Sequence, residues 1–264
     1  MKGETMNNEF KEFYIDHDGI PLHAKLSYPT DGMKDGKCPL VILLHGYTGH
    51  MEETHILAIA DEINRHGCAV LRIELYGHGK SGGTFTEHTV LKWMSEMMTV
   101  IDYARSLDFV SSLYLAGHSQ GGFVTAMAGS MKRDVLKAII LLSPALCIPA
   151  DARRGEVLGT SFDPEHIPDV LEMDGDRLLS GNYFRAAQTV DVESAMKRYK
   201  KPVLIVHGDE DESVPVQCAY DAAKIYEQAE LAVIPGDLHC YDRHLDQVTK
   251  VIGEYLDRME IVNQ

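Results

Sequence analysis

The sequence predicts an α/β protein built on a mostly parallel, eight-stranded sheet with helices on both faces. Continuous apolar runs such as 40–44 and 138–142 are typical of strands buried on both faces. Segments with apolar residues at helical spacing, such as 52–66 and 90–107, alternate with these runs, and such alternation is typical of parallel sheets. Two strand-like segments flank the turn signal Asp18-Gly19 near the start of the chain, so we expect one antiparallel edge.

Local signals mark each element in turn. Pro39 lies directly before the expected strand at 40–44, and Gly67 is the expected end of the helix at 52–66. The expected strands cover residues 10–16, 20–28, 40–44, 68–75, 113–116, 138–142, 202–207 and 230–234. The expected helices cover residues 52–66, 90–107, a segment from 123 onward, 192–199, 216–228 and 242–259.

Between about Cys147 and Val190 this alternation stops. This stretch is rich in Pro, Gly, Asp and Arg, and its apolar segments are short. At about forty residues it is also too short to form much of a hydrophobic core alone. We interpret it as a cap inserted over the sheet. Residues 1–264 are therefore expected to form a single domain with a cap at about 147–190.

Charge and cysteine content limit the partners and the compartment. The chain has 40 Asp and Glu against 25 Lys and Arg, and its net charge of −15 argues against nucleic acid or an anionic membrane surface as a partner. Five cysteines without CxxC spacing favour free thiols in a reducing compartment. The first ten residues lack an apolar signal core, and no apolar run is long enough to span a bilayer. We expect a cytoplasmic protein and leave open whether it forms a homodimer.

The most informative motif is Gly117-His-Ser-Gln-Gly121, which lies between the strand at 113–116 and a helical segment. In a G-x-S-x-G turn of this kind the serine adopts a strained backbone conformation and stands above the sheet. The flanking glycines prevent collisions across the turn, and the helix N-terminus favours negative charge beside the serine. We predict that Ser119 is a nucleophile; the simpler interpretation is a glycine-rich turn.

A serine nucleophile needs a base, and the base needs a group that orients it. The loop after the strand at 202–207 contains Asp209 and Asp211, and the loop after the next strand contains His239. This is the chain order expected of a Ser, acid and His set at the ends of parallel strands. We favour Asp211 over Asp209 because the usual loop pattern is G-x-x-D, counted from Gly208. The remaining histidines are expected at the surface or in turns, and Cys240 is interpreted as a structural or incidental thiol.

Catalysis by a serine nucleophile also needs donors for the oxyanion of the tetrahedral intermediate. One expected donor is the backbone N–H of Gln120, which follows the nucleophile, and the other is the backbone N–H of Tyr47, in the loop after the third strand. The alternative for the glycine loop at 45–49 is a tight turn alone. His45, His50 and His55 lack metal-ligand spacing for a helix, and the predicted reaction requires no metal or organic cofactor, so the predicted cofactor is none.

The sequence resembles the α/β-hydrolases along its whole length, and more narrowly the bacterial cinnamoyl (feruloyl) esterases. The narrower resemblance rests on H-G-Y-T-G, G-H-S-Q-G-G, L-S-P-A and an insertion of about forty residues after the sixth strand. It implies that the cap shapes a pocket for the phenolic part of hydroxycinnamate esters. It further implies that Asp151 and Tyr183 approach the aromatic hydroxyl; the alternative is that both are solvated loop residues.

These residues and the resemblance together predict a serine carboxylic-ester hydrolase that cleaves ferulate, p-coumarate or caffeate esters through an acyl-enzyme. Its expected partner is a small-molecule ester substrate. Two alternatives that would use the same serine-based mechanism are a monoacylglycerol lipase and a short-chain carboxylesterase. A more distant alternative is a non-catalytic ligand-binding protein, because one fold can serve several functions.

Overall fold

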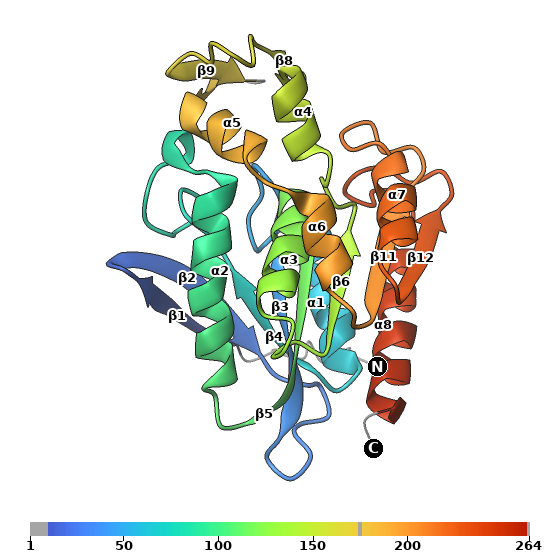
Figure 1. Cartoon of the computed structure of the whole chain (residues 1–264). Helices are drawn as coiled ribbons and strands as arrows, with labels where there is room; N and C mark the ends of the chain where they lie inside the picture. Colours follow the sequence, from blue (N-terminus) through green and yellow to red (C-terminus); the bar gives the residue numbers. More distant parts are fainter. Residues whose placement is uncertain (1–9, 174–175, 263–264) are drawn as a thin grey trace, which may run out of the picture.

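The computed structural model describes residues 10–173 and 176–262, and an eight-stranded sheet lies at its centre (Figure 1). The strand order is β1-β2-β4-β3-β5-β6-β11-β12. The pairs β1–β2 and β2–β4 are antiparallel, and the pairs from β4 to β12 are parallel. The predicted mostly parallel sheet with one antiparallel edge is confirmed. Its strands are β1 (Phe10–His17), β2 (Ile20–Ser27), β3 (Cys38–Leu44), β4 (Ala69–Ile73), β5 (Val110–His118), β6 (Ala138–Leu142), β11 (Val203–Gly208) and β12 (Ala229–Ile234).

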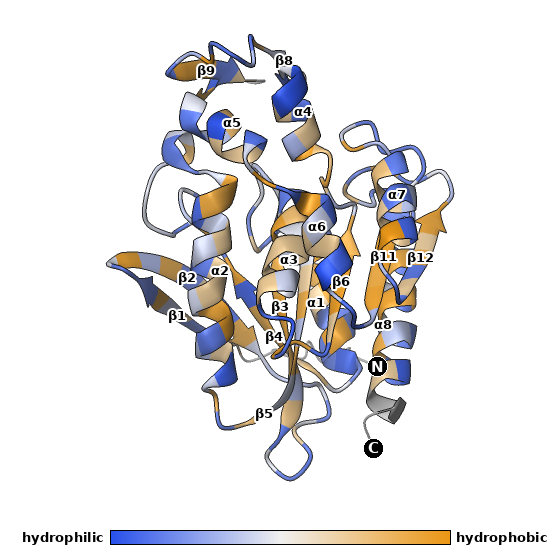
Figure 2. Ribbon diagram, viewed as in Figure 1, coloured by the Kyte–Doolittle hydropathy of each residue, from blue (hydrophilic) through white to orange (hydrophobic). Residues whose placement is uncertain are grey.

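Helices cover both faces of this sheet (Figure 1). One face is covered by α2 (Val90–Arg105), α3 (Gln120–Met131), α6 (Val192–Arg198) and α7 (Gln217–Ile225). The other face is covered by α1 (Thr54–Arg65) and α8 (Leu245–Val262). Figure 2 shows the apolar strands enclosed between these two helical layers. Within the described residues, none of the helices combines the length and the apolarity needed to cross a membrane.

The alternation of side chains along β3 explains why both faces need cover. Leu40, Ile42 and Leu44 belong to the apolar cluster on one face of the sheet, and Val41 and Leu43 belong to the cluster on the other. Successive strand residues point to opposite faces, so a continuous apolar run requires apolar partners on both sides. All seven residues of β3 are buried.

The expected insertion contains short elements rather than a core of its own. They are α4 (Ile148–Arg154), β7 (Glu156–Val157), β8 (Thr160–Ser161), β9 (Val170–Met173), β10 (Arg177–Ser180) and α5 (Gly181–Gln188). β7 pairs with β8 and β9 pairs with β10, each antiparallel. β10 packs against a 3₁₀ turn, η1 (Phe85–Glu87), and α5 packs against α2. We refer to residues 147–190 as the cap; it lies beyond one end of the sheet (Figure 1).

Candidate active site

Ser119 lies at the turn between β5 and α3, with φ 56° and ψ −120°. This backbone conformation is unusual for a non-glycine residue and is held by its surroundings: the Ser119 N–H donates to the Leu142 carbonyl over 2.9 Å. A Cβ at Gly117 would lie 2.3 Å from the Gly121 carbonyl oxygen, and a Cβ at Gly121 would lie 2.3 Å from that of His45. The turn therefore closes only because glycine occupies both positions.

Asp211 and His239 meet at the ends of β11 and β12. Nδ1 of His239 lies 2.7 Å from Oδ2 of Asp211, and the Asp211 side chain is fully buried. The backbone N–H groups of Ser213 and Val214 donate to the other carboxylate oxygen, each over 2.8 Å. Because Nδ1 of His239 is held by the carboxylate, Nε2 is the ring nitrogen left for a second partner.

Asp209, the alternative to Asp211, has another contact. Its carboxylate accepts a hydrogen bond from the Gly236 N–H over 2.6 Å, which ties the loop after β11 to the loop after β12. The structure thus brings Asp211 to His239 and places Asp209 in a turn contact.

His207, at the end of β11, is a site residue that the sequence did not single out. Its Nε2 lies 3.0 Å from Oδ2 of Asp211 and 3.0 Å from the Val214 carbonyl oxygen, and its side chain is fully buried. A carbonyl can only accept, so this nitrogen carries the proton and donates to both groups. Burial alone would raise the pKa of Asp211, but hydrogen bonds from His207 and His239 hold that pKa well below its ordinary value. Asp211 is therefore ionised at neutral pH.

Several histidines pack inside the protein, so the expectation of a surface position is wrong for them. Most of the histidines expected at the surface or in turns are buried, namely His23, His45, His55, His78, His88, His118 and His207. Burial lowers the pKa of three of them, to about 3 in His45, about 4 in His55 and about 3 in His88. These rings therefore pack as neutral aromatic groups that can still make hydrogen bonds.

His118 makes one of these hydrogen bonds directly to the loop that carries His239. Its Nε2 lies 2.8 Å from the His239 carbonyl oxygen, and its Nδ1 lies 3.2 Å from Nε2 of His55. The rings of His118 and His239 are also in contact, with centroids 4.7 Å apart. Tyr241 fixes the same loop from the other side, since its hydroxyl donates to the Val206 carbonyl over 3.1 Å.

The two residues predicted to supply oxyanion amides belong to segments that lie next to Ser119. Gln120 begins α3, so its N–H has no partner within the helix. The loop that carries Tyr47 lies against Ser119, since a Cβ at Gly46 would be 3.0 Å from the Ser119 Cβ and 3.5 Å from its Oγ. Among the described residues, neither of these amides donates to another protein group.

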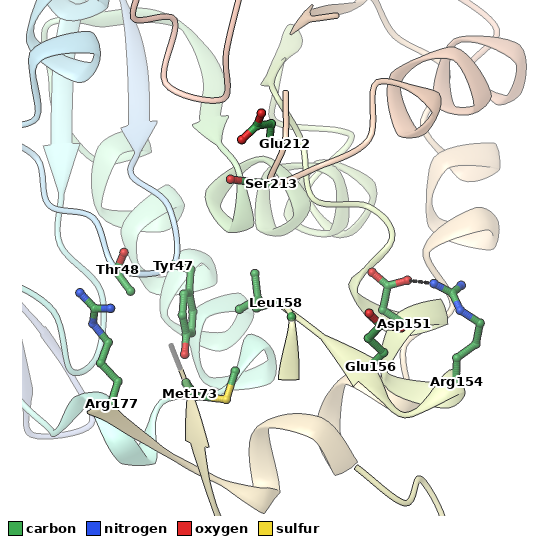
Figure 3. Close-up of a pocket in the computed structure, with 11 residues that line it drawn as sticks. Tyr47, Thr48, Asp151, Arg154, Glu156, Leu158, Met173, Arg177, Glu212 and Ser213 are labelled. Atoms are coloured by element: carbon green, nitrogen blue, oxygen red, sulfur yellow. Dashed lines mark hydrogen bonds and ion pairs between the residues drawn. The ribbon is translucent and has the colours of Figure 1, made fainter. Parts of the chain in front are cut away.

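Ser119 and His239 line the same cavity, of about 160 Å³, together with Gly46 and Tyr47. A second cavity of about 570 Å³ lies between the cap and the core (Figure 3). Figure 3 shows Leu158, Met173 and Arg177 of the cap around this space, together with Tyr47 and Ser213 of the core. The two cavities adjoin, because they share the lining residues Tyr47, Thr48, Leu158 and Ser213. The cavity that contains Ser119 and His239 thus lies beside a larger one.

The two cap residues expected near the substrate ring have different surroundings. Asp151 lines the larger cavity, where it forms an ion pair with Arg154 (Figure 3). Tyr183 is fully buried, and its hydroxyl donates to Oε1 of Gln120 over 2.7 Å. The Tyr183 hydroxyl thus contacts the residue that follows Ser119, a link between cap and core that no sequence signal predicted.

Comparisons with known proteins indicate the family and the fold. The family model described as serine aminopeptidase S33 matches residues 36–173. A solved structure of Est1E from Butyrivibrio proteoclasticus with ferulic acid bound is 51% identical, covers 94% of this chain and 99% of that chain, and has a TM-score of 0.92. A second Est1E structure is 48% identical, with a TM-score of 0.89, over 95% of this chain and 99% of that chain. The mitochondrial palmitoyl-protein thioesterase ABHD10 of Mus musculus is 26% identical over 71% of this chain, and the match spans only 64% of that protein.

Proposed function

This chain belongs to the serine aminopeptidase S33 family of α/β-hydrolases and is a carboxylic ester hydrolase, and we propose that it cleaves hydroxycinnamate esters such as those of ferulate, p-coumarate and caffeate. The observation that carries the proposal is the gathering of three groups at the ends of β5, β11 and β12, at one edge of the sheet. Ser119 and His239 line one cavity, and Asp211 holds the histidine at 2.7 Å. Similarity to Est1E, whose structure holds ferulic acid, supports the choice of substrate.

In the proposed first half-reaction, Oγ of Ser119 attacks the ester carbonyl carbon while Nε2 of His239 takes the hydroxyl proton. Asp211 stabilises the imidazolium that forms. The backbone N–H groups of Tyr47 and Gln120 bind the oxyanion, and each such donor is worth about 3 kcal/mol in a site closed to water. Collapse of the intermediate breaks the ester C–O bond, and His239 returns its proton to the leaving alcohol.

The second half-reaction regenerates the enzyme. His239 takes a proton from water, and the resulting hydroxide attacks the acyl carbon. The Ser119 Oγ leaves and recovers its proton from His239, and the hydroxycinnamic acid is released. Water is the only further reactant that this half-reaction consumes.

The cavity under the cap supports an aromatic acyl group with polar substituents. Its volume of about 570 Å³ is in the range of small-molecule sites. Leu158, Met173 and the Tyr47 ring provide apolar surface, whereas Asp151 and Arg177 place charged groups in the same lining. Such a mixture favours a phenolic ring over a long lipid chain.

Replacement of the nucleophile tests the reaction. We expect Ser119→Ala to abolish hydrolysis of p-nitrophenyl acetate and labelling by a fluorophosphonate probe, while the far-ultraviolet circular dichroism stays that of the wild type. Retained turnover with a wild-type spectrum would refute the assignment of Ser119.

A comparison of substrates tests the acyl group. We expect a higher kcat/KM for methyl ferulate and methyl p-coumarate than for a short aliphatic methyl ester or a monoacylglycerol. A clear preference for the monoacylglycerol would refute the hydroxycinnamate proposal and favour a lipase, without changing the result for Ser119.

A further inference from the structure

A group of potential metal ligands lies directly beside the candidate active site. His55 at the start of α1, His118 at the end of β5 and Cys240 in the loop after β12 each offer one ligand atom, and these atoms lie within 4.8 Å of one another. Both imidazoles are almost fully buried, at 4% and 3% exposure, whereas Cys240 is partly exposed. Three separate elements thus converge on one point with two nitrogens and one sulfur.

The distance between the two nitrogens is already close to that of a metal site. Nε2 of His55 and Nδ1 of His118 are 3.2 Å apart. In a tetrahedral zinc site with Zn–N bonds of about 2.05 Å, two nitrogen ligands lie about 3.3 Å apart. The separation of the two nitrogens therefore already fits a zinc site, and the rings would only have to turn so that both lone pairs point at the ion. A sulfur ligand lies about 3.6 Å from each nitrogen in such a site, so Cys240 would move by about 1 Å.

We propose that His55, His118 and Cys240 bind one Zn²⁺ ion, with a water molecule as the fourth ligand. The ion takes the place of the proton that His55 shares with His118, and that proton moves to Nδ1 of the His55 ring. The Cys240 thiol loses its proton to solvent, so that a thiolate binds the metal. Nε2 of His118 keeps its proton and its hydrogen bond to the His239 carbonyl. Two imidazoles and a thiolate form a donor set that zinc prefers over magnesium or calcium.

A cation has a route to this point. A cavity of about 530 Å³ is lined by His55 and Cys240 together with the acidic residues Glu52, Glu53 and Asp242. Glu52 is partly neutralised by ion pairs with Lys25 and Arg72, but Glu53 and Asp242 add negative charge to the lining. Negative charge in a concave site raises the local concentration of cations. Cys240 also lines the cavity that contains Ser119, so the proposed site borders the reaction centre.

Occupation of this site would inhibit the esterase, a consequence that rests on the proposed function of His239. Cys240 follows His239 directly, and the movement of its sulfur toward the two imidazoles pulls the same loop. A displacement of about 1 Å in a catalytic group can lower the rate about 100-fold. We therefore infer that zinc lowers kcat by about 100-fold, and that removal of the metal restores it.

Cobalt binding tests the site without reference to activity, because Co²⁺ bound by a thiolate has a near-ultraviolet charge-transfer band. Wild-type protein should bind one Co²⁺ per chain with this band, and excess Zn²⁺ should abolish the band by displacement. Cys240→Ser should lose the band and bind Zn²⁺ at least about tenfold more weakly, because a thiolate ligand is gone. His55→Gln should weaken binding similarly, and Cys147→Ser, which removes a partly exposed thiol in the cap, should retain the wild-type spectrum.

The results separate the proposal from its alternatives. An unchanged band in Cys240→Ser, or no band in the wild type, would overturn the metal site. Inhibition is then measured on p-nitrophenyl acetate, with each variant compared with its own metal-free rate. Zinc inhibition that is equal in the wild type and Cys240→Ser would overturn the inhibitory mechanism. If Ser119→Ala retained activity, the cobalt spectra would still decide the metal site.

Discussion

Removal of the Tyr183 hydroxyl distinguishes two roles for the cap. The resemblance to feruloyl esterases predicts that Tyr183 contacts the substrate hydroxyl, whereas in the structure its own hydroxyl is bonded to Oε1 of Gln120 at 2.7 Å inside the protein. Tyr183→Phe keeps the ring and its packing against Tyr47, whose centroid lies 6.2 Å away, and deletes this single hydrogen bond. Gln120 contributes the backbone donor that we propose for the oxyanion.

The expected size of the effect follows from burial. Tyr183 is fully buried, so its loss as a donor leaves a buried amide oxygen unsatisfied, which destabilises a protein by about 1–3 kcal/mol. Complete loss of an oxyanion donor lowers kcat by about 100- to 1000-fold. Tyr183 acts on that donor only through the position of Gln120, so we expect a decrease of about tenfold, within this limit.

Kinetics on two esters provide the assay. If Tyr183 positions Gln120, kcat should fall by the same factor for methyl ferulate and for p-nitrophenyl acetate, with KM nearly unchanged. If Tyr183 instead binds the phenolic hydroxyl, KM should rise for methyl ferulate alone. That second pattern would refute the positioning role. Thermal unfolding of the variant shows separately whether the stability loss is present.

Three further predictions test other parts of the site. Asp211→Asn should lower kcat by about 10⁴-fold because the base loses its orienting anion, whereas Asp209→Asn should have a far smaller effect on the same assay, and the reverse order would transfer the role. Gly46→Ala places a Cβ 3.0 Å from that of Ser119, so kcat should fall while circular dichroism shows an intact fold. Burial raises the pKa of Glu96 from 4.5 to about 7, so its contribution to stability is fully present below pH 4.5 and is lost as the pH rises through about 7. Glu96→Gln should remove this pH-dependent loss of stability, which amounts to about 3 kcal/mol at pH 8. Denaturant unfolding of the wild type and the variant at pH 5 and at pH 8 measures the difference.

The sequence was sufficient where local patterns determine the structure. The strand–glycine–serine–glycine–helix motif predicted the turn at Ser119, and the spacing from Gly208 selected Asp211 as the aspartate that the structure brings to His239. Parallel strands bring their carboxyl ends to one edge, so the order of these residues along the chain already implied that they would be close in space.

The sequence was insufficient where long-range packing decides. A histidine carries no periodic signal, so nothing distinguished His207, fully buried against Asp211, from an exposed turn residue. The bond between Tyr183 and Gln120 joins residues 63 positions apart, and it depends on how the cap lies on the core. The motif Gly117–Gly121 does predict that Gln120 follows the nucleophile, but it says nothing about the partner of the Gln120 side chain.

The hydrogen bond between Tyr183 and Gln120 links the cap directly to the residue after Ser119 in the core. A cap that only surrounded the substrate could vary without affecting the chemical step. Here α5 of the cap carries a buried hydroxyl that holds the side chain of the residue next to the nucleophile. Movement of α5 would displace Gln120, and with it an amide that we propose for the oxyanion. Because transition-state stabilisation depends on donors fixed before the reaction, a shift in the cap should alter kcat as well as substrate preference. We therefore expect specificity and rate to be coupled through this buried contact, so that mutations in the cap are best tested for both.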